Sequence, residues 1–242
     1  MEQTSHRPWP IRDDAPWVMT QSWHDLLFAH WRVDPRQLRT RVPGAFELDL
    51  FEDTCWVGIV PFHMTNVAPR GVPALPWLSA FPELNVRTYV RVGDRPGIYF
   101  FSLDAGSAAA VLAAYTMLNL PYHHANMTVS QAGETITYRS VRYSNPDAAF
   151  DGTYEPLGAV FEAPPGSLEQ FLTERYCLYH LDHRAHAYRL DIHHPPWRLQ
   201  RARATLVRNT MADVSGIALP FKPPLLHFAK RQDAVAWPPT VL

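Results

Sequence analysis

The stretch ELNVRTYVRVGDRPGIYFFSL, residues 83–103, decides the fold. Two runs typical of strands, Glu83–Val92 and Ile98–Leu103, flank the turn GDRPG at residues 93–97. Glycine and proline in the turn break both runs, so the segment predicts a β-hairpin.

Side chains on the first strand of this hairpin separate by character. Because residues two apart in a strand share a face, one face presents Glu83, Asn85, Arg87, Tyr89 and Arg91. The opposite face is apolar except for one threonine and must pack against other residues. The polar face either meets solvent or lines the interior of a closed sheet and holds a ligand. Asn and Tyr between the charges favour the interior, because Lys and Glu usually crowd a solvated face.

Outward from the hairpin, the chain contains more strand signals than helix signals. Strands are expected at Ser22–Val33, Phe46–Phe51, Cys55–Met64, Tyr122–Gln131 and Thr135–Tyr143. Helices are expected from Pro35 to Val42 after the cap Asp34, over Gly106–Asn119 with the cap Ser107, and from the capping pair Ser167 and Gln170 to about Tyr179. Residues 66–82 are expected to form a loop. The pattern predicts an α+β, mostly-β closed sheet with two or three flanking helices, as a Pro-rich arm (1–20) and one domain (21–242).

Composition excludes several classes of protein. The formal net charge is -1, which gives no electrostatic attraction to nucleic acid or anionic membranes. No apolar run reaches the roughly 18–20 residues of a membrane span, and the polar N-terminus does not resemble a secretory signal. Two distant cysteines, Cys55 and Cys177, fit a reducing compartment, so a cytoplasmic protein is expected. Lys222 and Lys230 are the only lysines among the 22 basic residues.

A second polar row follows the alanine-rich helix. Tyr122, His124 and Asn126 share one strand face, and His123 lies on the other. Such a row can donate and accept protons near neutral pH, although a purely structural hydrogen-bonded row is at least as common. The histidines at 180, 183 and 186 lack the spacing of a helical metal site, and no nucleotide-binding glycine motif occurs. Neither a metal nor a cofactor is expected.

Six segments carry a resemblance to a known family: FAHWRVDPRQLRTRVP (28–43), ELNVRTYV (83–90), GIYFFSLDA (97–105), LPYHHA (120–125), ERYCLY (174–179) and IHHPPW (192–197). Together they resemble the uncharacterised YqjF-like family, a branch of the acetoacetate decarboxylase-like superfamily. The resemblance runs from about Trp17 to Trp237. It implies a cone-shaped β-barrel with outer strands, flanking helices and a ligand cavity inside.

The resemblance also carries over single residues. Arg32 matches the superfamily's barrel arginine, and Glu83 matches its catalytic glutamate. Tyr122 and His123 stand where the decarboxylases have two lysines, the first of which attacks the ketone as a neutral amine. Tyrosine and histidine form no imine, so we expect that the chain is not a Schiff-base decarboxylase.

Two functions stay open. The first is a small-molecule enzyme of the lyase, isomerase or dehydratase type, acting on a carboxylate- or carbonyl-containing metabolite. Its catalytic residues would be Glu83, Tyr122, His123 and His124, and its substrate-binding residues would be Arg32, Asn85, Arg87, Tyr89, Arg175 and Tyr176. The alternative is a non-catalytic metabolite-binding or sensor module that uses the same pocket. The expected partner is a small anionic metabolite, and homo-oligomer formation stays open.

Overall fold

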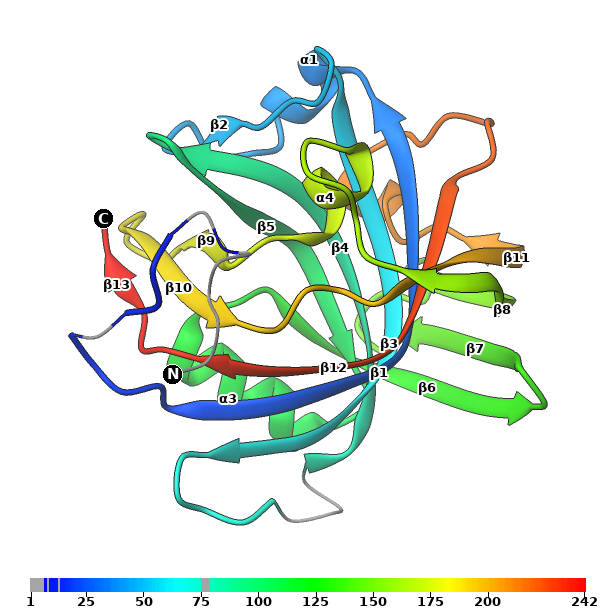
Figure 1. Cartoon of the computed structure of the whole chain (residues 1–242), viewed down its shortest axis with the longest axis horizontal. Helices are drawn as coiled ribbons and strands as arrows, with labels where there is room; N and C mark the ends of the chain where they lie inside the picture. Colours follow the sequence, from blue (N-terminus) through cyan, green and yellow to red (C-terminus); the bar gives the residue numbers. More distant parts are fainter. Residues whose placement is uncertain (1–6, 8, 13, 75–78) are drawn as a thin grey trace.

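The computed structural model of the chain describes residues 7, 9–12, 14–74 and 79–242 (Figure 1). The helices in this part are α1 (Pro35–Arg39), α3 (Ala108–Leu118), α4 (Leu168–Thr173) and the 3-10 turn η1 (Asp213–Ser215). The strands are β1 (Met19–Val33), β2 (Glu47–Leu48), β3 (Cys55–Pro69), β4 (Phe81–Val92), β5 (Arg95–Ala105), β6 (Tyr122–Ala132), β7 (Thr135–Arg142), β8 (Ala149–Phe161), β9 (Cys177–Leu181), β10 (Ala187–His193), β11 (Leu199–Asn209), β12 (Leu225–Ala236) and β13 (Thr240–Val241). This mostly-β arrangement confirms the expected fold class.

All strands of the described residues belong to one sheet that closes on itself. Its order is β13-β10-β9-β5-β6-β7-β8-β11-β12-β1-β3-β4-β2, and two further pairings, β5 with β4 and β10 with β12, close the ring. The result is roughly cone-like rather than a regular barrel. β1, β3, β4 and β12 form a shared wall, with β6, β7 and β8 on one side of it and β9 and β10 on the other (Figure 1).

The two faces of this shared wall meet different surroundings. Leu84 and Val86 of β4 pack into the largest apolar core, together with Tyr138 and Phe150 from β7 and β8. The alternate residues of β4 face the side that β9 and β10 close. This division follows from the two-residue period of a strand. It turns Glu83, Asn85, Arg87 and Tyr89 inward, as expected, whereas Arg91 near the end of β4 is exposed and pairs with Glu47 at 3.6 Å.

Local signals fix several element ends as expected. The Asp34 side chain accepts from the backbone N–H of Arg36 at 2.8 Å and begins α1. The Ser107 hydroxyl accepts from the Ala110 N–H at 3.3 Å and begins α3. Asn119 ends α3 in the left-handed region, with a φ of 51°. These are the side-chain caps that satisfy the free backbone groups of a helix end.

Three expectations need correction. α4 begins at the cap Ser167 but ends at Thr173, not near Tyr179, because the following residues pair as β9 with β5 and β10. The strand expected at Phe46–Phe51 shrinks to Glu47–Leu48. β3 continues to Pro69, so the loop expected at 66–82 is shorter. In the first and third cases, pairing with a distant strand overrides the local preference, whereas β2 is short because only its two residues pair with β4.

No helix within the described ranges is both long and apolar enough to cross a bilayer.

Candidate functional site

A cavity of about 520 Å³ lies on the side of the shared wall that β9 and β10 close. Most of its lining is apolar or aromatic. The larger of these side chains are Trp23, Leu26, Val60, Phe62, Met64, Phe81, Ile98, Leu103, Trp197 and Trp237. Its volume is within the roughly 300–1,000 Å³ range of small-molecule sites.

Glu83 and Tyr122 form a hydrogen-bonded pair in the cavity wall. β5 brings them together, because it pairs with β4 at Glu83 and with β6 at Tyr122. The Tyr122 hydroxyl donates to Oε2 of Glu83 at 3.0 Å. Burial raises the pKa of Glu83 to about 8, although the Tyr122 hydrogen bond opposes that rise. At neutral pH, Glu83 is therefore mostly a neutral carboxylic acid, a form suited to giving up a proton.

Asn85 and Arg87 continue the same polar row along β4. Oδ1 of Asn85 and Nε of Arg87 are buried and have no hydrogen-bond partner among the described residues. One terminal nitrogen of Arg87 donates to the backbone oxygen of Leu172 at 3.1 Å. No described carboxylate forms an ion pair with Arg87, while its guanidinium lies over the Phe28 ring at 5.3 Å. A buried cation without a counter-ion is costly, so this row is incomplete without an anionic group.

Arg175 also lines the cavity, but its charge is already matched. One of its terminal nitrogens donates to Asp49 Oδ2 at 2.6 Å, and its Nε donates to the Phe171 carbonyl at 2.7 Å. The sequence predicts Arg175 inside the helix that begins after Ser167, whereas the structure places it two residues after Thr173, the last residue of α4. Arg175 therefore closes this end of the cavity and offers less to a ligand than Arg87 does.

Tyr89 and Tyr176, two of the expected binding residues, lie outside the cavity lining. The Tyr89 hydroxyl donates to the Leu172 carbonyl at 2.8 Å and lies 2.7 Å from Nε2 of His30. Tyr89 therefore donates to the same Leu172 carbonyl as Arg87 does. The Tyr176 hydroxyl bonds to Glu174, and its ring stacks on His194 with centroids 4.6 Å apart.

The structure does not bring Arg32 to the cavity. Its side chain is exposed and lies over the Trp56 ring at 5.2 Å, at the end of β1 that leads into α1. Strand alternation places Arg32 on the same face as Leu26, which lines the cavity, but six residues farther along. The cavity ends before that point, so the carry-over of a barrel arginine to Arg32 is not supported by the geometry.

His123 and His124 also miss the cavity. His123 faces the opposite side of β6 from Tyr122. Burial lowers the pKa of His123 most, the neighbouring Arg142 lowers it further, and Asp104 opposes both effects. His124 shares a face with Tyr122 but lies against the Tyr143 ring at a tilted angle, with ring centroids 4.6 Å apart. β6 leaves the cavity after its first residue, and the proton-transfer row expected from the sequence is reduced to Tyr122.

Sequence reasoning missed the aromatic wall. Trp197 stacks on Trp23 with centroids 5.9 Å apart and meets Phe28 edge-on at 5.0 Å. His194, three residues before Trp197 in the Pro-rich segment, also lines the cavity. The sequence signal that could have found this wall is the segment IHHPPW, which carries the family resemblance.

Neither lysine is near this site. Lys230 is exposed and pairs with Asp25 at 2.6 Å, and Lys222 is exposed in the segment before β12. Within the described part of the chain, no cluster of three or more metal-binding side chains occurs.

Comparisons with known proteins agree with this architecture. Residues 20–233 match the family model DUF2071, described as an uncharacterized conserved protein. The chain is 48% identical over 225 residues to the uncharacterized protein YqjF of Bacillus subtilis (strain 168), covering 93% of each.

Solved structures with the same fold are more distant in sequence. A structure of the enduracididine biosynthesis enzyme MppR has a TM-score of 0.65 at 12% identity, covering 94% of this chain and 90% of that one. The acetoacetate decarboxylase of Legionella pneumophila has a TM-score of 0.63 at 14% identity, covering 98% and 92%. At such identity the likeness concerns the fold alone.

Proposed function

The chain belongs to the DUF2071 family, and from that premise and the cavity's geometry we propose that it acts on a carboxylate-containing metabolite by acid–base chemistry at Glu83. The reaction would be of the lyase, isomerase or dehydratase type and would form no imine. The observation that carries the proposal is one cavity lined both by Glu83, whose pKa burial raises to about 8, and by Arg87, a buried arginine with no carboxylate partner among the described residues.

Arg87 is the proposed anchor of the substrate's anionic group. Guanidinium pairs strongly with carboxylate through charge-assisted hydrogen bonds. A bound carboxylate would give Arg87 a counter-ion that the described residues do not supply. Asn85, whose side-chain oxygen lacks a partner, would accept a hydrogen bond from a substrate hydroxyl or amide.

Glu83 is the proposed proton donor. In its neutral form it would protonate a carbonyl or departing hydroxyl oxygen of the substrate. The carboxylate so formed would keep the Tyr122 hydrogen bond and then recover a proton from a substrate carbon or from water, which restores the starting state. A pKa close to the working pH favours such a double role.

The imine-free character rests on the amines. Both lysine side chains are exposed outside the cavity lining, and Tyr122 occupies the wall beside Glu83. Imine chemistry requires a desolvated amine held against the substrate. Borohydride added with acetoacetate or pyruvate should therefore produce no mass gain on Lys222 or Lys230. A covalent adduct on either lysine would contradict this part of the proposal.

The structural relatives support the choice of ligand class. Structures of MppR hold pyruvate or the condensation product of pyruvate with an imidazole carboxaldehyde. Both ligands derive from an oxo acid and occupy a protein of the same fold. An oxo or hydroxy acid is accordingly the first class to screen.

A non-catalytic metabolite-binding module is the second candidate. The observation that favours it is the position of His123 and His124, which removes two of the four expected catalytic side chains from the cavity.

The test begins with thermal-shift screening of oxo and hydroxy acids, followed by NMR assays of turnover for each hit. Arg87→Met should abolish binding, and Arg32→Met, an exposed arginine outside the cavity, should not. Glu83→Gln should retain binding and lose turnover by at least about 100-fold. Binding without turnover in the unmodified protein would favour the non-catalytic module, and hits that survive Arg87→Met would overturn the proposed site.

A further inference from the structure

The polar groups of the cavity lie far apart along β4. Glu83 and Arg87 are four residues apart on one strand, which separates their Cα atoms by about 13 Å. Their side chains also turn to opposite ends. Arg87 donates toward Leu172 of α4, while Glu83 accepts from Tyr122 after α3. One ligand that contacts both groups must therefore be elongated.

The space between and beside these groups is apolar. The aromatic wall starts at Arg87, because its guanidinium lies over Phe28, and continues through Trp197 to Trp23. On the side of α3, the residues that face the cavity are alanines, Ala110, Ala113 and Ala114, whose small side chains leave room. A ligand in this space gains by covering carbon rather than by hydrogen bonding.

A short oxo acid fits this volume poorly. At roughly 30 Å³ for each water-sized group, the six heavy atoms of pyruvate fill only about a third of the 520 Å³ cavity. Pyruvate bound at Arg87 would also leave Glu83 without a reacting partner. The rest of the apolar lining would then remain uncovered.

We propose that the ligand is an elongated amphipathic monocarboxylate with a carbon body of at least about five atoms and an oxygen function at the end opposite the carboxylate. The minimum length follows from the separation of about 13 Å less a hydrogen bond of about 3 Å at each end, which leaves about 7 Å. At about 1.2 Å per bond of an extended chain, this distance spans roughly six bonds, which is five carbons between the two terminal oxygens. This inference rests on the proposed function, because it assumes that Arg87 anchors the anion and that Glu83 meets the reacting oxygen.

Chain length is the first measurement. Titration calorimetry of straight-chain carboxylates from two to fourteen carbons should show the dissociation constant falling roughly fourfold per methylene until the chain fills the cavity. Arg87→Met should weaken every acid at least tenfold and leave n-alkanols of the same length unchanged. Arg32→Met serves as the matched control and should behave as the unmodified protein. An affinity that does not depend on chain length would overturn the inference.

The position of the oxygen function is the second measurement. In a series of acids with a terminal hydroxyl, the hydroxyl should weaken binding at short lengths, where it meets only apolar side chains. That penalty should vanish near about five carbons, where the hydroxyl reaches Glu83 and Tyr122. Tyr122→Phe should restore part of the penalty at this length and change the others little. A penalty that is constant along the series would contradict the assignment of Glu83 to the far end.

These results separate the inference from the proposed function. If long acids bind with the expected length dependence but no oxygenated analogue is converted, the catalytic proposal fails and the ligand class stands. If pyruvate or acetoacetate is converted and chain length has no effect, the catalytic proposal stands and the ligand class fails.

Discussion

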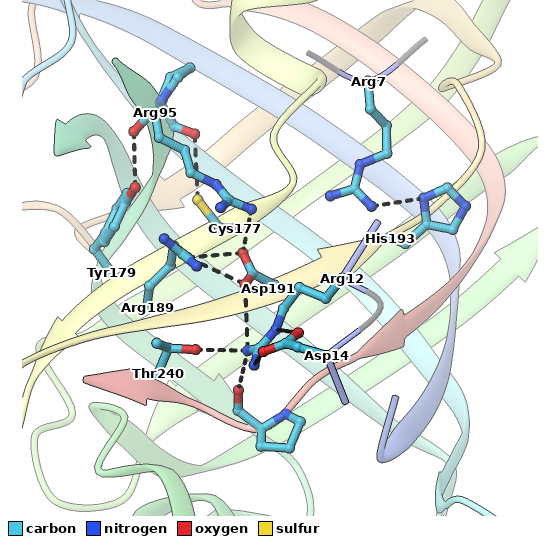
Figure 2. Close-up of polar contacts among 12 residues, drawn as sticks. Arg7, Arg12, Asp14, Arg95, Cys177, Tyr179, Arg189, Asp191, His193 and Thr240 are labelled. Carbon is cyan, nitrogen blue, oxygen red and sulfur yellow. Dashed lines mark hydrogen bonds and ion pairs between the residues drawn. The ribbon is translucent and has the colours of Figure 1, made fainter. Parts of the chain in front are cut away.

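Asp191 on β10 and Arg87 on β4 are both buried charged side chains, yet the chain surrounds them differently. Oδ1 of Asp191 accepts from Arg95 at 2.8 Å and from Arg189 at 3.1 Å, and Arg12 lies 3.7 Å from Oδ2 (Figure 2). Arg87 has a single carbonyl partner and no described carboxylate. We infer that the arginines around Asp191 neutralise its charge and give it a structural role. A bound anion would do the same for Arg87.

Glu83 extends the comparison to a carboxyl group. Among the residues that the structure describes, no arginine bonds to Glu83, and the Tyr122 hydroxyl is its only side-chain partner. Asp191, in contrast, joins three segments that are distant in sequence: the N-terminal arm at Arg12, the start of β5 at Arg95, and β10 itself (Figure 2). A carboxyl group among cations locks segments together, whereas one among apolar groups holds a proton.

Glu83→Gln should have the largest effect, seen in the pH dependence of stability. Because the folded pKa of about 8 exceeds the ordinary value of 4.5, the folded state binds the extra proton between these values. The stability due to protonated Glu83 is thus fully present below pH 4.5 and is lost as the pH rises through 8. At about 1.4 kcal/mol per pKa unit, the loss is at most roughly 5 kcal/mol. Urea unfolding from pH 5 to 8.5 should show this decline relative to Glu83→Gln, and parallel curves for the two proteins would refute it.

Asp191→Asn should rank second. The substitution keeps the shape but leaves the cluster of arginines without their carboxylate, so we expect a loss of about 3 kcal/mol in the free energy of unfolding. The control is Asp14→Asn at the exposed end of the same cluster, where solvent screens the Arg12 pair and the free energy of unfolding should change much less. Equal losses for both variants, measured by urea unfolding at pH 7, would remove the contrast with Arg87.

Tyr122→Phe should have a smaller effect on stability, about 1 kcal/mol for one hydrogen bond. The hydrogen bond from Tyr122 lowers the pKa of Glu83 against the effect of burial. Its removal should therefore raise that pKa above 8. A carbon-13 NMR titration of the Glu83 carboxyl, assigned with Glu83→Gln, measures the change, and a fall in the pKa would contradict the assigned role of Tyr122.

Arg87→Met should change stability least, by less than about 1 kcal/mol. Methionine keeps much of the apolar stem against Phe28, and no carboxylate loses its partner. Thermal unfolding without ligand tests this expectation. A loss as large as that of Asp191→Asn would mean that Arg87 is a structural charge after all.

Local patterns predicted much of the site's framework. The alternation on β4 correctly assigned the inward face of Glu83, Asn85 and Arg87, because side-chain direction in a strand depends only on residue parity. The caps Asp34, Ser107 and Ser167 likewise began their helices where expected, since capping is a contact between near neighbours.

Positions along the strands could not be predicted in the same way. Arg32 and His124 share faces with cavity residues but lie beyond the cavity's ends, and the strand register that sets those ends involves partners distant in sequence. Trp197 reached the cavity through the packing of a Pro-rich segment that has no periodic pattern.

The sequence by itself determined the closed, mostly-β class, the polar row of β4 and the scarcity of amines, because composition and the two-residue period are local properties of the chain. Only the tertiary structure decided that Glu83 meets Tyr122 and that aromatic rings line the cavity between Glu83 and Arg87. It also decided that Arg87 has no carboxylate partner among the described residues, while Asp191 has three arginines nearby. Those facts depend on which distant strands pair and in what register, and burial then sets the protonation of whatever is enclosed.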